Sequence, residues 1–97
     1  MKILAFSVYD SKAQAFITPF FSQTRGTAVR SFEQACNDPN HDFGRFAEDY
    51  TLMCVGEFDQ ENGIFVAYEA PENMGLAASF VHDAYTKDDQ SLLKLEA

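Results

Sequence analysis

The stretch KILAFSVY, residues 2–9, decides the fold of the chain. Its apolar side chains recur at every second position, which predicts a β-strand with one face toward a core. The core face is expected to consist of Leu4, Phe6 and Val8. Polar turn residues 10–13 and the apolar stretch 14–18 follow directly. The second stretch should pair back on the first as a hairpin and end at Pro19, because proline cannot donate to the ladder.

A second hairpin is expected from YTLMCVGEF, residues 50–58, and IFVAYE, residues 64–69. The pair Asn62-Gly63 lies between these two apolar stretches, and both residues accept the positive φ of a tight turn. Alternation along the first of the two strands predicts that five residues share one face. These residues are Tyr50, Leu52, Cys54, Gly56 and Phe58.

Two segments repeat apolar residues at helical spacing, residues 24–37 and residues 73–86. The first should begin at Thr24 or Thr27 and stop before Pro39. Its apolar face would carry Ala28, Val29, Phe32, Ala35 and Cys36. The second should follow a chain break at APEN, and residues 40–49 between the first helix and the second hairpin are expected to form a polar loop.

The resulting order β-β-α-β-β-α predicts the α+β class, with a small antiparallel sheet of two β-hairpins covered by one or two helices. We expect a single α+β domain over residues 1–86 and a C-terminal tail over residues 87–97, flexible or docked through its leucines. A chain of 97 residues has a thin core, and its ten Phe and four Tyr exceed what that core needs. A homodimer is therefore expected.

Charge is distributed unevenly along the chain, whose net charge is −8. Residues 1–45 carry five basic and four acidic side chains, whereas residues 46–97 carry two and eleven. The acidic half would repel phosphates, which argues against strong nonspecific DNA binding. The nearly neutral N-terminal half remains open to nucleic acid.

No catalytic or metal-binding motif stands in the sequence, so we expect neither an enzyme nor a cofactor or metal ion. His41 and His82 lie outside any ligand motif. Cys36 and Cys54 fall on apolar faces and are expected to be free, buried thiols. No secretory signal and no membrane-length apolar run is visible, which favours a cytosolic protein without a membrane partner.

The candidate nucleic-acid site lies in the N-terminal half and combines cations for a phosphate backbone with rings for base stacking. Its members are Tyr9, Lys12, Phe20, Phe21, Arg25, Arg30 and Arg45. Phe20 and Phe21 cannot both point inward in an extended segment, so one ring should be exposed. The alternative is a protein-interaction surface, in which the arginines pair with carboxylates of their own chain. The nearest such carboxylates are Glu33, Asp38 and Asp42.

Three segments, in this order, resemble the small nonstructural protein family of the gokushoviruses, tail-less phages of the Microviridae with single-stranded DNA genomes. The segments are MKILAFSVYDSKAQAF (1–16), PFFSQTRGTAVRSFEQACNDPN (19–40) and EDYTLMCVGEFDQENG (48–63), within a resemblance that covers about residues 1–70. The matching positions include Phe20, Phe21, Thr24, Gly26, Arg30, Asp38, Glu48, Asp49 and Tyr50. The chain departs from the family before EDY, where Arg45-Phe46-Ala47 replaces a basic or histidine-proline lead-in.

The resemblance implies a protein that is absent from the virion and acts in the cytoplasm of the infected bacterium. It also implies a role in viral single-stranded DNA synthesis or genome packaging, through weak binding of single-stranded DNA or of a viral or host replication protein. The alternative function is an acidic protein-interaction or DNA-mimic module that binds no nucleic acid. An exposed patch of Arg25, Arg30 and Arg45 would favour DNA, whereas pairing of these arginines within the chain would favour the alternative.

Overall fold

The computed structural model of the protein describes residues 1–82, which form an antiparallel sheet with helices on one side. The elements are β1 (Lys2–Asp10), β2 (Ala15–Phe16), β3 (Phe20–Ser22), α1 (Arg25–Cys36), α2 (Asp42–Arg45), η1 (Ala47–Asp49), β4 (Tyr50–Asp59), β5 (Phe65–Leu76) and η2 (Ala77–Phe80). The predicted α+β class with an antiparallel sheet is confirmed. None of the helices over these residues is long and apolar enough to cross a membrane.

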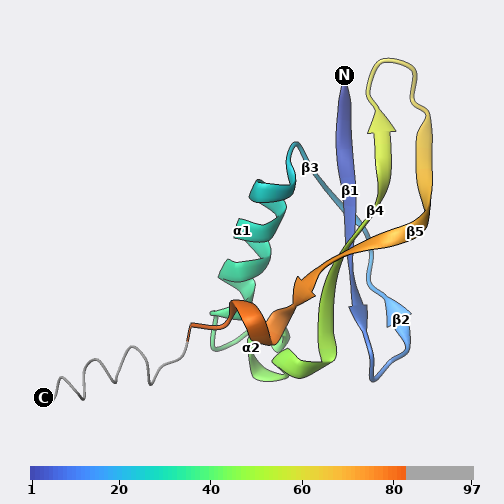
Figure 1. Cartoon of the computed structure of the whole chain (residues 1–97). Coiled ribbons are helices and arrows are strands. Elements are labelled where there is room, and N and C mark those ends of the chain that lie inside the picture. Colours follow the sequence, from blue (N-terminus) through green and yellow to red (C-terminus); the bar gives the residue numbers. More distant parts are fainter. Residues whose placement is uncertain (83–97) are drawn as a thin grey trace, which may run out of the picture.

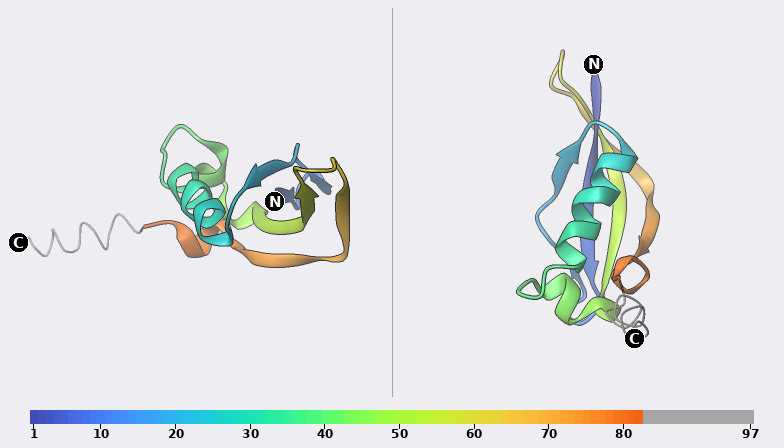
Figure 2. Two further views of the ribbon diagram at one scale, coloured as in Figure 1. Left: turned by 90° about the horizontal axis from the view of Figure 1, so that it is seen from above. Right: turned by 90° about the vertical axis from the view of Figure 1, so that its left-hand side faces the viewer.

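The strands follow the order β2-β1-β4-β5, and β3 pairs with the same edge of β1 as β2. The stretch after the first turn is therefore one edge strand in two pieces, interrupted at Pro19, which confirms the first predicted hairpin. Asp10 fixes this turn, because its side chain accepts hydrogen bonds from the amides of Lys12 and Ala13. Figures 1 and 2 show α1 lying across one face of the sheet, over β1 and β4.

The core lies between α1 and the sheet. Phe6 and Val8 of β1 are fully buried there, and Leu4 packs against them at the margin, as the alternation predicts. The remaining buried members of the cluster are Ala28, Phe32, Cys36, Leu52, Cys54 and Ala77. The two cysteines are free, so the predicted absence of a disulfide agrees with their placement.

Helix α1 has the ends that its sequence predicts. The Thr24 hydroxyl accepts a hydrogen bond from the amide of Thr27 at 3.1 Å, which satisfies one of the unpaired donors of the first turn. At the other end Asn37 donates through Nδ2 to the carbonyls of Glu33 and Phe80, at 2.8 and 3.0 Å. Asn37 therefore ends the helix and also fastens η2 to it.

A bulge in β4 corrects the prediction that five of its residues share one face. Phe6 pairs with Cys54 but its neighbour Ala5 pairs with Gly56, so Val55 is an extra residue. Leu52 and Cys54 belong to the core beneath α1, whereas Gly56 and Phe58 lie on the opposite face, because directly paired residues share a face.

The second predicted helix, residues 73–86, is wrong over its described part. Residues 73–76 belong to β5, only Ala77–Phe80 turn helically, and residues 83–86 lie outside the described chain. The predicted break at APEN is also wrong, since β5 runs through it and pairs with β4 on either side. The expected loop 40–49 contains two short helical turns, α2 and η1. The predicted tail, residues 87–97, falls outside the described residues.

Candidate functional site

Arg25 stands at the first residue of α1 and is held by Glu72 of β5. Its Nη2 donates to Oε1 of the carboxylate at 2.8 Å, and its Nε donates to Oε1 and Oε2 at 3.1 and 3.3 Å. These hydrogen bonds to Glu72 raise the pKa of Arg25. A helix N-terminus disfavours a cation, so the carboxylate compensates an otherwise unfavourable position. The predicted outward cation at the helix start is thus paired within the chain.

Arg45 is paired as well. Its Nη1 lies 3.5 Å from Oδ1 of Asp42, one turn earlier in α2, and its guanidinium stacks over the Phe46 ring at 5.3 Å. Asp42 is one of the carboxylates that the protein-interaction alternative named. Both side chains are more than half exposed, so the pair stabilises α2 only slightly and mainly neutralises the arginine.

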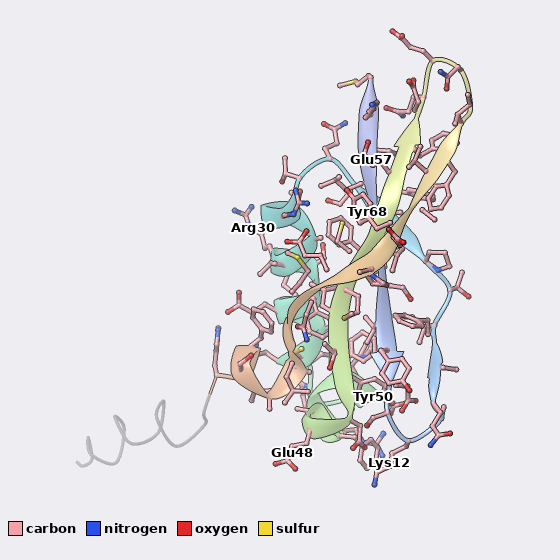
Figure 3. All side chains as sticks on the ribbon, turned by 45° about the vertical axis from the view of Figure 1, so that its right-hand side comes forward. Lys12, Arg30, Glu48, Tyr50, Glu57 and Tyr68 are labelled. Carbon is pink, nitrogen blue, oxygen red and sulfur yellow. The ribbon has the colours of Figure 1, made fainter. Side chains whose placement is uncertain are left out.

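Arg30 and Lys12 form no ion pair with any residue in the range 1–82. Arg30 projects from the outer side of α1, whereas Lys12 lies in the turn after β1 at the far end of the sheet (Figure 3). The structure therefore does not bring the predicted cations together into one patch.

Phe20 and Phe21 point to opposite faces of the sheet, as the sequence predicts for adjacent residues of a strand. Phe20 pairs with Phe6 and stacks on its ring at 5.8 Å, on the side of α1. Phe21 pairs with Ala5 on the helix-free face and is 50% exposed. Only Phe21 is therefore available to a partner to any large extent.

Phe21 belongs to a row of three rings on the helix-free face, here called the ring row: Phe21, Phe58 and Phe65. The rings of Phe21 and Phe58 lie 5.9 Å apart between centroids, and Phe58 pairs directly with Phe65. The ring row crosses the sheet above two small residues, Ala5 and Gly56. A methyl group added at Gly56 would lie 2.9 Å from Cζ of Phe65, so this ring covers the glycine.

Tyr9 and Phe16 form a second aromatic pair at the other end of the sheet. They are paired across β1 and β2, and their rings lie 5.0 Å apart. Phe16 is nearly half exposed. Lys12 lies in the adjoining turn, which follows β1 and is remote in the sequence from Arg25 and Arg30.

Three residues that shape these surfaces, Phe58, Phe65 and Glu72, were not predicted as site residues. The hairpin at Asn62-Gly63 is visible in the sequence and implies that Phe58 opposes Phe65, so that pair could have been found. The face on which the pair lies depends on the bulge at Val55, which leaves no clear sequence signal. Glu72 was predicted to lie in a break between two elements. Its contact with Arg25, 47 positions away, therefore could not be predicted from the sequence.

The polar groups that could carry chemistry have structural partners. His41 caps α2, since its Nδ1 accepts a hydrogen bond from the amide of Phe43 at 3.1 Å. Burial raises the pKa of the Cys36 thiol to about 11 and also raises that of Cys54, which keeps both thiols protonated and unreactive. Within residues 1–82, no three His, Cys, Asp or Glu side chains are grouped as metal ligands.

Comparison with known proteins gives one match. The family model described as Phage ORF5 protein matches residues 3–80, which is most of the chain. No curated protein and no solved structure matches it. The match agrees with the resemblance to a small phage protein, and assignment to the Microviridae is compatible with it. The chain therefore belongs to the Phage ORF5 protein family.

Proposed function

We propose that this phage protein is a nonstructural accessory protein of viral single-stranded DNA synthesis or genome packaging. It acts in the cytoplasm of the infected bacterium, outside the virion, by binding a viral or host replication protein. Family membership and the resemblance to gokushovirus proteins support the process. The observation that supports the mode of action is the Arg25–Glu72 pair, because Glu72 neutralises the cation that lies beside the N-terminal amides of α1.

Charge supports a protein partner over a phosphate backbone. Asp42 neutralises Arg45, and the two cations without an ion pair among residues 1–82 lie on different parts of the molecule. A DNA strand laid on any surface of a chain with net charge −8 would meet carboxylates as well as cations. A basic surface on a replication protein would instead be complementary to this chain and would associate with it faster at low salt.

Purification of the tagged protein from infected cells, with and without nuclease, tests this proposal. We expect a phage or host replication protein to be recovered in stoichiometric amount, and nuclease treatment to leave the complex intact. Inactivation of the gene should lower viral single-stranded DNA while the double-stranded form accumulates. Recovery that disappears after nuclease treatment, or normal single-strand synthesis without the gene, contradicts the proposal.

A second candidate function, direct weak binding of single-stranded DNA, is favoured by the exposed Phe21 ring and by Arg30. Anisotropy of a labelled oligonucleotide at low salt, where the phosphate contribution is largest, distinguishes the two. Direct binding predicts a salt-sensitive complex that the double variant Arg25→Ala/Arg30→Ala loses without unfolding. The favoured proposal predicts no binding by the native protein even at low salt.

A further inference from the structure

We infer that the helix-free face around the ring row is a docking surface for a second copy of this chain, which makes the protein a symmetric homodimer. Helix α1 covers the other face of the sheet, so this face has no cover within residues 1–82 (Figures 1 and 2). The inference concerns assembly and does not depend on which macromolecule the protein binds in the infected cell.

The centre of the helix-free face is apolar and closely packed. Phe21 and Phe65 remain 50% and 46% exposed although they lie side by side with Phe58 above Ala5 and Gly56. Contiguous rings that stay half exposed on a small domain mark an interaction site rather than core. Two such faces can interdigitate their rings as stacked sheets do, at a spacing of about 10 Å.

The paired strand positions of this face carry no charged side chain at its centre. They are Ile3, Ala5 and Ser7 of β1, Met53, Gly56 and Phe58 of β4, Phe65 and Ala67 of β5, and Phe21 of β3. A nucleic acid would require cations here, and a basic protein would require carboxylates. An uncharged face fits an uncharged partner face, which a second copy supplies.

The carboxylates of β4 nearest the ring row lie on the other face of the sheet, because Glu57 pairs with Leu4 and Asp59 pairs with Lys2, so they repel a second copy less. Asp59 and Glu61 lie 3.8 and 3.7 Å from the N-terminal ammonium group, and Glu57 lies 3.7 Å from Lys2. Glu57 also accepts a hydrogen bond from Tyr68 at 3.2 Å, near the top of the sheet (Figure 3). Glu57 and Asp59 are thus both neutralised and turned away from the ring row.

The exposed apolar area is sufficient for a weak dimer. A half-exposed phenylalanine offers roughly 100 Å², so Phe16, Phe21 and Phe65 offer roughly 300 Å². Stable complexes bury about 800 Å² on each partner, so this smaller apolar area is consistent with a weak dimer. We expect a dissociation constant in the micromolar range.

Sedimentation equilibrium of the full chain over a range of concentrations tests this inference. The native protein should reach twice the chain mass of 10.9 kDa at tens of micromolar. Phe21→Ser and Phe65→Ser should each weaken the dimer by at least about tenfold, because each change removes a ring from both copies. Phe46→Ser is the matched control, since Phe46 is equally exposed at 50% but lies beyond α2.

A native protein that stays monomeric at 100 μM overturns the inference, and so does a dimer that Phe46→Ser weakens as much as the ring-row changes. If the variants unfold, nuclear magnetic resonance can instead detect contacts between labelled and unlabelled native chains and so locate the interface. Contacts at the rings of Phe21 and Phe65 support the inference, and contacts elsewhere alone contradict it.

Salt provides a further readout on the native protein. Added salt should tighten the dimer, because it screens repulsion between two copies of net charge −8. A nucleic-acid complex should weaken with added salt instead. If an oligonucleotide dissociates the dimer and contacts the ring row, this face binds stacked bases and the inference fails.

Discussion

At the scale of single residues, the Arg25–Glu72 pair determines the charge of the surface where α1 begins. Its guanidinium and carboxylate are both nearly half exposed, so water screens their attraction. The pair therefore contributes little to stability but decides whether a cation faces outward. Arg30, one turn further along α1, has no such partner among residues 1–82.

Replacing Glu72 by Gln should free Arg25 with little loss of stability. We expect the free energy of unfolding, measured with urea, to change little, because water screens this exposed pair. Any affinity for an oligonucleotide should rise, because Arg25 then faces a phosphate without a competing carboxylate. Glu48→Gln is the control, since it removes one exposed charge that forms no ion pair within residues 1–82. Equal oligonucleotide affinity in both variants would show that the pair does not regulate the surface.

Cys36 should make stability depend on pH in the alkaline range. Burial raises the pKa of its thiol to about 11 in the folded protein, whereas an unfolded chain has a thiol pKa near 9. The folded state therefore favours the protonated thiol, and this contribution is complete below pH 9 and lost as the pH rises toward 11.

The corresponding loss is about 2–3 kcal/mol at pH 11, and urea titrations at pH 8 and pH 11 measure it. Cys36→Ala should lose less stability between these two pH values, although its cavity makes it less stable at pH 8. An identical pH dependence in the variant would exclude the thiol as its source.

At the scale of elements, the bulge at Val55 shifts the alternation of β4, so that residues at every second position point to different faces of the sheet before and after it. Before the bulge its inward residues support α1, and beyond it Phe58 joins the ring row. Gly56 makes this possible, because β5 and the Phe65 ring lie directly against it. A side chain at this position would push β5 away from β4.

Gly56→Ala should consequently destabilise the protein by about 1–3 kcal/mol, since the added methyl group would collide with the backbone oxygen of Val66. Gly26→Ala is the matched control. Its nearest atom would be the Thr24 hydroxyl oxygen at 3.8 Å, and alanine favours the helix by up to about 1 kcal/mol. Thermal unfolding of both variants measures the difference, and equal melting temperatures would contradict the role assigned to Gly56.

At the scale of the whole molecule, repulsion among the excess acidic side chains destabilises the folded protein. Seven basic side chains face fifteen acidic ones, and cations among residues 1–82 pair with five of these carboxylates. Repulsion among the remaining carboxylates is screened by salt over a distance of about 10 Å at 0.1 M.

Raising the salt concentration from 20 to 300 mM at pH 7 should therefore raise the melting temperature by several degrees. The double variant Phe21→Ser/Phe65→Ser isolates this effect from dimer formation. Near pH 4.4, the isoelectric point, the net charge is close to zero and the salt effect should largely vanish. A melting temperature that falls with salt at pH 7 would show that attractive ion pairs outweigh the repulsion.

The sequence by itself determined the elements whose signals are local. The alternation in β1, the threonine cap and Asn37 stop of α1 and the turn at Asn62-Gly63 each act within a few residues, although the structure was needed to choose Thr24 over Thr27 as the cap. The same locality accounts for the opposed directions of Phe20 and Phe21, because a strand alternates whatever lies around it. Together these signals sufficed for the α+β class and the antiparallel sheet.

Only the tertiary structure decided the secondary structure of residues 73–80 and which side chains lie together on one surface. The spacing of Leu76, Ala77 and Phe80 suits a helix, but pairing with β4 keeps the preceding residues in β5. The pairing of Arg25 with Glu72 and the face of Phe58 likewise depend on register across the sheet. Local preferences amount to a fraction of a kcal/mol per residue, so long-range burial and pairing override them.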